Sequence, residues 1–376
     1  MTINNPDAEQ HGLGVHNPFA DYMKFLPKEI PLPIFYTPAE RQLLIGTSLC
    51  AALEQKSASL EREFDNLREA TQVIPWCQRV WWDDQPTSLE IDDWKLADAI
   101  YRSRALELPR GAGLGMVPVL DMANHASDDH FNARFEVDET QGQVLLVARD
   151  TKSIYRGEEI TIMYGVGGAC EMIFSYGFLD EHATSAREIF LDLQISFDDP
   201  LRLAKIRFAQ DAPGVRIYVD EHNEVQWEST FVWWACVNQE DGLDFRVEQA
   251  VTGDTELKAV WNGKDLPADA LQPTLLQQRL YDVFLLRATV TIQERVEMQG
   301  IHMASSQDTF EAQRPDNVNI RTSVYETIGR LRSLETDLLT RAYETLEVQV
   351  TRSPLCTGGD PARLTSSRNK NSWNLL

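Results

Sequence analysis

The sequence predicts an α+β protein in which a β-rich region is preceded by one helical segment and followed by another. Apolar residues recur at helical spacing up to about residue 106 and again after Arg187. Between these segments, residues 117–164 contain short apolar or alternating runs bounded by turn residues, which is the pattern of strands. With 376 residues, 43% of them hydrophobic, the chain is long enough for two domains with a sizeable core.

The first helical segment has a defined start. Residues 17–27 predict a short amphipathic turn or helix, and Thr37-Pro38-Ala39-Glu40 predicts the start of a longer one. Thr37 caps this helix and Pro38 takes its first position, while Glu40 completes a capping box.

Two helices are predicted between this cap and the β-rich region. Apolar residues from Leu43 to Leu67 follow at helical spacing, although Gly46 weakens the middle of that helix. A second helix is predicted over about Trp94–Leu106. Gly111–Gly115 has the letters of a phosphate-binding loop, but no buried strand precedes it, so it predicts a plain loop.

The β-rich region reads as strands joined by turns. Val117–Leu120 predicts a strand, and Phe131–Val137 with Val144–Ala148 predicts a hairpin. Ile160–Tyr164 predicts a further strand, and Cys170–Tyr176 predicts one or two helical turns.

The remainder of the chain, from residue 187 to 350, is predicted to be all-helical. Its expected helices are Pro200–Phe208, Ser229–Val237, Thr274–Gln299 and Asn317–Val350. The last helix carries an apolar stripe, formed by Val324, Ile328, Leu331, Leu334, Leu338, Ala342 and Leu346. Such a stripe indicates a packed core, with a partner-binding face as the alternative.

The net charge of the chain restricts the kinds of molecule that it can bind. The chain has 35 basic and 58 acidic residues, which gives a formal charge of −23. Such a field repels nucleic acid and anionic membranes and attracts basic proteins. We therefore expect a basic protein partner, no nucleic acid and no membrane; acidity that serves solubility alone is the alternative. No apolar run approaches the roughly 20 residues that span a bilayer.

The cysteines indicate a reducing compartment. Cys50, Cys77, Cys170, Cys236 and Cys356 are odd in number and scattered, which predicts neither a disulfide framework nor a zinc site. The polar, acidic N-terminus is unlike a secretory signal. We expect an intracellular protein, cytoplasmic or nuclear, that carries no metal.

Two signatures about 40 residues apart carry the functional prediction. The first is Asp121-Met-Ala-Asn124-His125, and the second is Gly157-Glu-Glu-Ile with Tyr164-Gly165, followed by Phe174-Ser-Tyr-Gly-Phe178. Taken singly, Asn-His indicates an Asx-capped turn and each tyrosine a core residue. Their succession in this order indicates a site for a small charged cofactor.

This succession resembles the C-terminal half of the SET domain, the fold of protein lysine methyltransferases. It resembles specifically the Rubisco large-subunit-methyltransferase-like branch, and the resemblance covers about residues 17–350. S-adenosylmethionine is the cofactor that the resemblance implies. Methyl transfer depends mostly on positioning and on the exclusion of water. Aromatic walls suit it because their faces attract the sulfonium and the ammonium groups.

The resemblance also implies residue roles. Arg104 would pair with the cofactor carboxylate, and Tyr164 would be the catalytic tyrosine beside the transferred methyl group. The cofactor-binding residues that it implies are Arg104, Asp121, Met122, Ala123, Asn124, His125, Tyr164, Tyr176, Gly177 and Phe178.

The composition of the two ends and the resemblance of the middle together divide the chain into five parts. They are a disordered leader over 1–16, a helical SET insert over 17–110, the C-terminal part of the SET domain over 111–186, a helical substrate-binding domain over 187–350 and a disordered tail over 351–376. The family's initial Gly-x-Gly strand is not recognisable. Gly12-Leu13-Gly14 has the right letters but lacks the flanking strand pattern, so we expect an N-terminal lobe that is truncated.

The leading functional prediction is a lysine N-methyltransferase that acts on a non-histone, basic protein, ribosomal proteins being one such class. The alternative is a catalytically inactive, truncated SET protein that serves as a binding module or scaffold. Histidine as the methyl acceptor is a third possibility. The substrate, the degree of methylation and the oligomeric state are not determined by the sequence.

Overall fold

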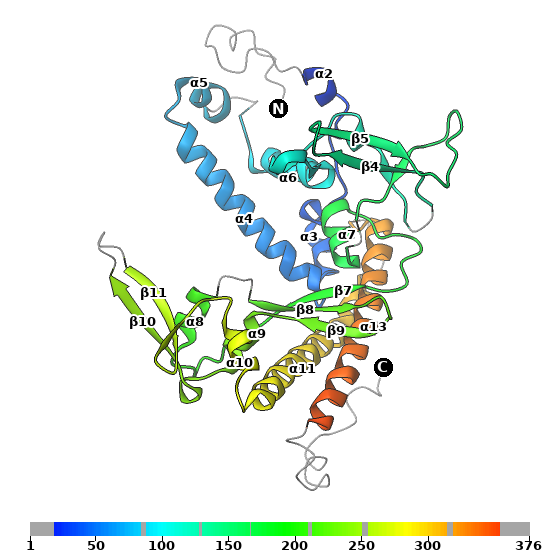
Figure 1. The fold of residues 1–376 in the computed structure, drawn as a ribbon. Coiled ribbons are helices and arrows are strands. Elements are labelled where there is room, and N and C mark those ends of the chain that lie inside the picture. Colours follow the sequence, from blue (N-terminus) through cyan, green and yellow to red (C-terminus); the bar gives the residue numbers. More distant parts are fainter. Residues whose placement is uncertain are drawn as a thin grey trace. The chain divides into compact units, whose positions relative to one another are not determined.

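The computed structural model describes residues 19–83, 88–127, 130–165, 167–209, 213–249, 255–313 and 319–353. The chain forms two compact units (Figure 1). The first unit comprises Met1–Thr184 and Thr309–Leu331, and the second comprises Ser185–Asp308 and Arg332–Leu376. The predicted leader over 1–16, Gly12–Gly14 and the tail beyond residue 353 lie outside the described residues.

Helices form the first part of the first unit. They are α2 (Ala20–Met23), η1 (Pro33–Phe35), α3 (Pro38–Gln42), α4 (Ser48–Thr71), α5 (Pro75–Cys77), the π-helical turn η2 (Gln78–Trp82) and α6 (Ile91–Arg104). The α4 helix contacts both α6 and the later helix α7 (Ala169–Tyr176).

The predicted capping box at the start of α3 is confirmed. The Thr37 hydroxyl accepts a hydrogen bond from the Glu40 main-chain nitrogen, and the Glu40 carboxylate accepts one from the Thr37 nitrogen. The single helix that the leucine spacing predicts is instead divided into α3 and α4. Gly46 has φ +90°, a conformation that interrupts a helix and that glycine adopts without strain.

The strands of the first unit are short. They are β1 (Leu106–Glu107), β2 (Leu114–Gly115), β3 (Asn124–His125), β4 (Ala133–Asp138), β5 (Gln143–Ala148) and β6 (Thr161–Ile162). The predicted hairpin is confirmed, because β4 and β5 pair antiparallel from Ala133–Ala148 to Asp138–Gln143. The Asp138 carboxylate accepts hydrogen bonds from the main-chain nitrogens of Thr140 and Gln141, which fixes the turn.

The predicted strand over Val117–Leu120 is wrong. The segment turns, with Val119 at φ +75° and 78% exposed, and it leads into the 3-10 helix η4 (Leu120–Met122). The Asp121 nitrogen bonds the Val117 carbonyl at 3.2 Å, which is a local bond rather than a ladder bond. Pro118 has no N–H to donate to a neighbouring strand, so this apolar run cannot continue a sheet.

The second unit contains both helices and strands. Its elements are β7 (Glu188–Asp192), α8 (Arg202–Phe208), β8 (Gly214–Val219), β9 (Val225–Glu228), α9 (Phe231–Cys236), η5 (Gln239–Asp241), β10 (Leu243–Gln249), β11 (Thr255–Trp261), β12 (Lys264–Leu266), α10 (Leu271–Leu276) and α11 (Tyr281–Ser305). Helix α12 (Gln307–Ala312) follows and begins at the boundary between the units.

The α+β class and the C-terminal helical region are confirmed, but the all-helical description of 187–350 is wrong. Two antiparallel sheets, β7-β8-β9 and β10-β11-β12, lie in that range. In the first of them Ile189 pairs with Ile217 and Leu191 with Val215, and all four side chains are buried. Alternating buried residues of this kind were the signal for strands.

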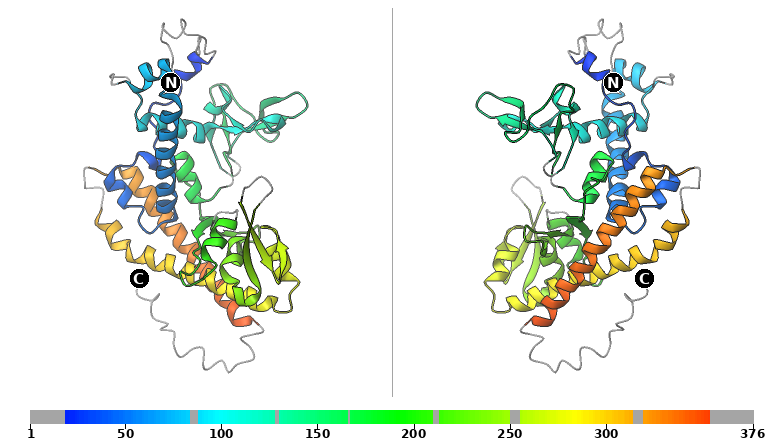
Figure 2. Two further views of the ribbon diagram at one scale, coloured as in Figure 1. Left: turned by 90° about the vertical axis from the view of Figure 1, so that its left-hand side faces the viewer. Right: turned by 90° about the vertical axis from the view of Figure 1, so that its right-hand side faces the viewer.

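The long helix α13 (Thr322–Arg352) contributes to both units. Its apolar stripe is core: all of its members are buried except Leu334, which is partly exposed. Within the second unit, Arg332 of α13 donates to the Met303 carbonyl and the Ser306 hydroxyl at the end of α11. Figure 2 shows α11 in gold and α13 in orange to red. No helix among the described residues is long and apolar enough to cross a membrane.

Candidate active site

The two sequence signatures meet in a parallel strand pair of the first unit. Strands β3 and β6 pair so that Asn124 faces Thr161 and His125 faces Ile162. Ala123, Ala133 and Ile162 form a small buried cluster beneath this pair. The pairing therefore brings Asn124-His125 beside the segment that continues to Tyr164, as the succession of motifs predicts.

Tyr164 is fixed by two hydrogen bonds to the first signature. Its hydroxyl donates to the Ala123 carbonyl oxygen at 2.9 Å, and its main-chain nitrogen donates to His125 Nδ1 at 3.1 Å. Because Nδ1 accepts a hydrogen bond, the proton of the neutral imidazole lies on Nε2.

Aromatic rings surround this pair. The Tyr164 and Tyr176 ring centroids lie 4.7 Å apart, and the His125 ring lies 5.3 Å from Tyr164 and 5.7 Å from Phe178. Burial raises the pKa of Tyr164, against the opposing charge of Arg104, and burial likewise raises the pKa of Tyr176. Both phenols therefore keep their protons at neutral pH.

Asp180 holds the other side of the His125 imidazole. His125 Nε2 lies 3.7 Å from Asp180 Oδ2. Burial lowers the pKa of His125, although the Asp180 charge opposes this effect. Burial acts to raise the pKa of Asp180, but hydrogen bonds from Ser127 and from the His182 main chain outweigh it and lower that pKa. Arg330 of α13 donates to the Asp180 carbonyl oxygen at 2.8 Å and so anchors this segment.

The partly exposed Arg104, at the end of α6, pairs with the buried Asp121. Arg104 Nη1 donates to the Asp121 carbonyl oxygen at 2.8 Å and lies 3.7 Å from Asp121 Oδ2, while the Tyr22 hydroxyl donates to the same Oδ2 atom. Met122 Sδ also contacts Arg104 Nη1 at 3.7 Å. Burial and the hydrogen bond to Asp121 raise the pKa of Tyr22.

Two polar atoms of this pair are buried without a partner. Asp121 Oδ1 and Arg104 Nε make no hydrogen bond within the described part of the chain. A buried polar atom without a hydrogen bond is costly, so these two atoms fit a ligand that carries both a cation and a carboxylate. The site thus fits a zwitterionic amino-acid moiety such as that of S-adenosylmethionine. No group of three or more His, Cys, Asp or Glu side chains that could hold a metal is found among the described residues.

Asn124 is exposed, and its side-chain amide is bound by a residue of the second signature. Its Nδ2 donates to Glu159 Oε1 at 2.5 Å. The buried Asn132 donates to the Glu159 carbonyl at 2.8 Å and accepts from the Thr161 nitrogen at 2.9 Å. The Gly-Glu-Glu-Ile motif is therefore joined to the hairpin and to the Asn-His motif at one place.

Gly177 permits a close approach of two segments. It ends α7 with φ +81°, and a Cβ atom there would lie 2.7 Å from the Pro31 carbonyl oxygen. Only glycine combines the left-handed conformation with this lack of a side chain. The turn directs the chain onward to Phe178 and Asp180.

The sequence-predicted site residues thus gather around β3, β6 and the end of α7. Sequence reasoning missed Tyr22, Asn132, Glu159 and Asp180 as residues of the site. Glu159 lies within the second signature and Asp180 lies two residues after it, so their closeness to the motifs in the sequence could have identified them. Tyr22 and Asn132 had no signal in the local sequence, because their partners are distant along the chain.

Comparisons with known proteins agree with this geometry. A family model described as Cytochrome c lysine N-methyltransferase 1 matches residues 111–202. SET domain-containing protein 8 of Schizosaccharomyces pombe is 29% identical over 278 residues, which cover 72% of this chain and 60% of that protein. The chloroplastic ribulose-1,5 bisphosphate carboxylase/oxygenase large subunit N-methyltransferase of Nicotiana tabacum is 28% identical over 207 residues, or 53% of this chain and 40% of that protein.

A solved structure shares the fold. The structure of Rubisco LSMT bound to AdoMet matches with a TM-score of 0.59 at 17% identity, covering 94% of this chain and 76% of that chain. The fold is the one that carries the SET domain in that structure. Homologues of this chain are SET-domain methyltransferases that include Rubisco LSMT-like proteins, and its fold is that of Rubisco LSMT. The chain spans between 40% and 60% of the length of the two curated relatives.

Proposed function

We propose that this protein is an S-adenosylmethionine-dependent protein-lysine N-methyltransferase. The observation that carries the proposal is the parallel pairing of β3 and β6, which joins Asn124-His125 to Tyr164. The similarity to lysine methyltransferases supports the same reaction.

We base the proposed cofactor-binding residues on the Arg104–Asp121 pair and on the pairing of β3 with β6. Arg104 offers a guanidinium to the cofactor carboxylate, and Asp121 offers the unpaired Oδ1 atom to its ammonium group. We include the main chain of Met122 and Ala123 with Asn124 and His125, because these residues directly follow Asp121 and lead into β3. S-adenosylmethionine, when bound, supplies a methyl group on a sulfonium that a neutral amine can attack.

The aromatic residues act by positioning and by excluding water. Tyr164 keeps its hydroxyl proton and directs it to Ala123, which holds the phenol in one orientation. Tyr176, Gly177 and Phe178 close the other side of the aromatic wall. Aromatic groups attract both the sulfonium of the cofactor and the ammonium of a lysine.

The substrate that we propose is a non-histone, basic protein. The chain's formal charge of −23 favours such a partner. We assign the acceptor as lysine rather than histidine, because lysine is the residue in the description of the matching family model. The second unit, with its two sheets and long helices, is the proposed substrate-binding part. Cys50, Cys77, Cys170 and Cys236 form no disulfide bond within the described part of the chain, which supports the proposal of an intracellular location, cytoplasmic or nuclear.

Cofactor binding and label transfer test the proposal separately. Calorimetric titration with S-adenosylmethionine measures binding, and radiolabelled cofactor with cell-extract proteins measures transfer. We expect saturable binding and label on lysine residues. Tyr155→Phe is the matched control, because Tyr155 is 75% exposed and should leave both measurements unchanged. Absence of both binding and transfer, also in a form extended upstream of Met1, would refute the proposal.

A second candidate is a binding module without methyl transfer. The observation that favours it is the size of the central sheet: among the described residues, β3 and β6 pair only with each other. The other edge of β6 is hydrogen-bonded by Asn132 rather than by a further strand. Micromolar cofactor binding without label transfer in any form of the protein would support this candidate.

A further inference from the structure

The two glutamates of the Gly157-Glu-Glu-Ile motif have different partners. The Glu158 carboxylate accepts a hydrogen bond from the Tyr155 main-chain nitrogen at 2.8 Å and so closes the turn that precedes β6. The Glu159 carboxylate instead reaches across to β3 and accepts from Asn124 Nδ2 at 2.5 Å. Glu158 therefore stabilises a local turn, whereas Glu159 contacts a residue of the proposed cofactor site.

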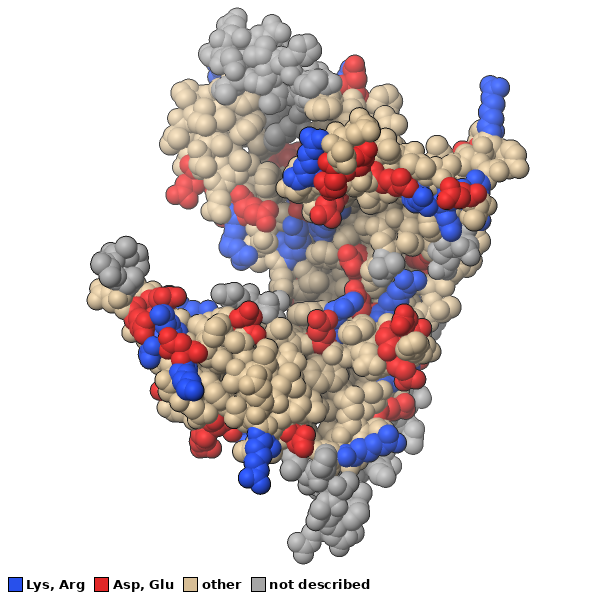
Figure 3. All heavy atoms as spheres, in the orientation of Figure 1, with Lys and Arg blue, Asp and Glu red and all other residues tan. Residues whose placement is uncertain are grey.

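The partner of Glu159 is unlike that of many other carboxylates of the protein. Figure 3 shows acidic and basic side chains interspersed on the surface, and ion pairs such as Arg134–Glu136 and Arg216–Glu188 join some of them. No basic side chain among the described residues forms an ion pair with Glu159, whose side chain bonds the Asn124 amide. The negative charge of Glu159 is therefore stabilised by an N–H donor rather than by a cation.

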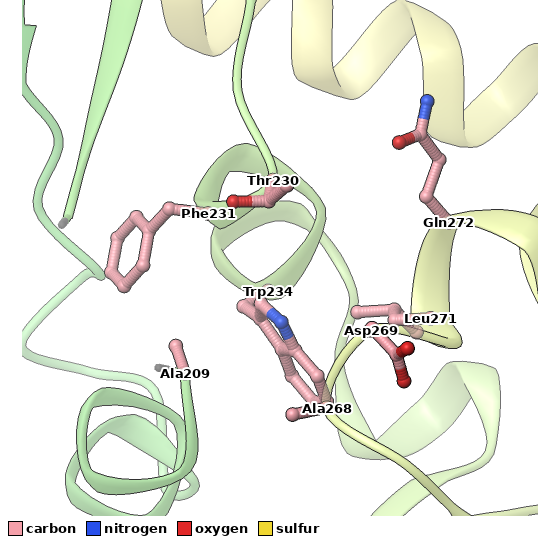
Figure 4. Close-up of a pocket in the computed structure, with 8 residues that line it drawn as sticks. All are labelled: Ala209, Thr230, Phe231, Trp234, Ala268, Asp269, Leu271 and Gln272. Atoms are coloured by element: carbon pink, nitrogen blue, oxygen red, sulfur yellow. The ribbon is translucent and has the colours of Figure 1, made fainter. Parts of the chain in front are cut away.

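This carboxylate determines which way the Asn124 amide points. An ionised carboxylate only accepts hydrogen bonds, so the amide nitrogen of Asn124 faces Glu159 and the amide oxygen points away. Gln272, beside a cavity of about 170 Å³ in the second unit, is the opposite case (Figure 4). No described residue hydrogen-bonds the Gln272 amide, so its oxygen and nitrogen can exchange places by rotation.

Main-chain contacts hold Asn124 and Glu159 in register. Asn124 pairs with Thr161 where β3 and β6 run side by side. The buried Asn132 donates to the Glu159 carbonyl oxygen at 2.8 Å and accepts from the Thr161 nitrogen at 2.9 Å. Both backbones are thus tied to Thr161, directly or through Asn132, and the two side chains meet in a fixed geometry.

The amide oxygen that points away from Glu159 is available to a ligand. Asn124 is an exposed residue, and no described residue donates a hydrogen bond to its Oδ1 atom. The same place borders the proposed catalytic tyrosine. Burial is the main cause that raises the pKa of Tyr164, and the negative charge of Glu159 adds to this effect. A hydrogen-bond acceptor of fixed orientation therefore lies at the edge of the site.

We propose that Glu159 is a positioning residue of the cofactor site, which holds the Asn124 amide with Oδ1 directed at an N–H group of bound S-adenosylmethionine. Glu159 acts through Asn124 and does not touch the ligand. The N–H groups of that molecule are its ammonium group and the amino group of its adenine. This inference rests on the proposed function, and it adds Glu159 and one interaction to the residues of that site.

A double-variant cycle, measured by calorimetric titration of the full chain with S-adenosylhomocysteine, tests the contact. Asn124→Asp alone places two carboxylates against each other and should weaken binding by at least about tenfold. Adding Glu159→Gln restores a donor opposite an acceptor, so it should recover most of this loss. Glu159→Gln alone should weaken binding by only about two- to threefold, because the glutamine amide can still accept from Asn124.

Thermal unfolding without ligand measures the same cycle independently of binding. We expect Asn124→Asp to lower the melting temperature and Glu159→Gln to restore it, so a poorly folded single variant still reports the contact. Glu158→Gln is the matched control, because it removes the same charge from the neighbouring glutamate and should rescue neither measurement. The proposal is overturned if Glu159→Gln has equal effects with and without Asn124→Asp, or if Glu158→Gln rescues as well.

Desamino-S-adenosylhomocysteine, which lacks the ammonium group, identifies the N–H donor. If the coupling in ligand affinity disappears with this ligand, the ammonium group is the donor; if it persists, the adenine amino group is. A wild-type protein that binds neither ligand would overturn the proposed function together with this inference. Binding without coupling between positions 124 and 159 would overturn the role of Glu159 alone.

Discussion

The Tyr164 hydroxyl donates a 2.9 Å hydrogen bond to the carbonyl oxygen of Ala123, which ties the second signature to the first. Tyr164→Phe removes this bond and leaves the main-chain bond to His125 in place. We expect methyl transfer to fall by at least about 100-fold, because positioning supplies most of the catalysis. Cofactor affinity should change little. Label-transfer rates and calorimetric titration measure the two effects.

The same variant has a modest effect on folding. Loss of this one partly buried hydrogen bond should lower the free energy of unfolding by about 1 kcal/mol. A large loss of stability together with lost cofactor binding would show that Tyr164 is structural rather than part of the chemistry.

Asp180→Asn should lower the pKa of His125 further below its usual range. The Asp180 carboxylate opposes the effect of burial on that imidazole, and the substitution removes its charge. The pKa of folded His125 already lies below the unfolded value of about 6.5, so stability falls as the pH drops below 6.5. Stability of the Asp180→Asn variant should therefore fall more steeply than that of the wild type as the pH drops below 6.5.

Titration of the His125 ring signal by NMR measures the pKa directly. Glu181→Gln is the matched control, because Glu181 is an exposed carboxylate next to Asp180. An unchanged His125 titration in Asp180→Asn would contradict the role of the pair.

Gly177→Ala should destabilise the first unit by about 1–3 kcal/mol. The new Cβ atom meets the Pro31 carbonyl oxygen at 2.7 Å, and the backbone has φ +81°. Gly165→Ala provides the control, since no atom lies within 4 Å of the Cβ position there. Urea denaturation of both variants checks the difference, and equal stabilities would refute it.

Glu40 should stabilise the protein in a pH-dependent way. Burial acts to raise its pKa, but hydrogen bonds from Arg321 and Thr37 outweigh it and hold the pKa at about 2, against an ordinary value of 4.5. A depressed pKa contributes stability that is complete above about pH 4.5 and is lost as the pH falls towards 2.

Glu40→Gln should therefore reduce the free energy of unfolding by about 1–3 kcal/mol at neutral pH. The difference from the wild type should shrink below pH 4.5. Urea midpoints measured across this range provide the test. Glu61→Gln, an exposed position on α4, should follow the wild type throughout.

Local sequence patterns predicted the elements whose stability is local. The capping box at Thr37 and Glu40, the β4–β5 hairpin and helix α7 all depend on neighbours within a few residues. Patterns failed where a local feature competed with the apolar run. The chain turns at Pro118 instead of forming the strand expected over Val117–Leu120, and Gly46 divides the expected helix into α3 and α4.

The sequence by itself determined the two signatures, the helical segment before the β-rich region and the acidic charge that favours a basic partner. Only the tertiary structure decided that β3 and β6 pair in parallel, and that Tyr22 and Asp180 join Asp121 and His125. It also decided that the second unit contains two sheets. The physical reason is that these contacts join residues far apart in the chain, where no local periodicity or cap encodes the partner.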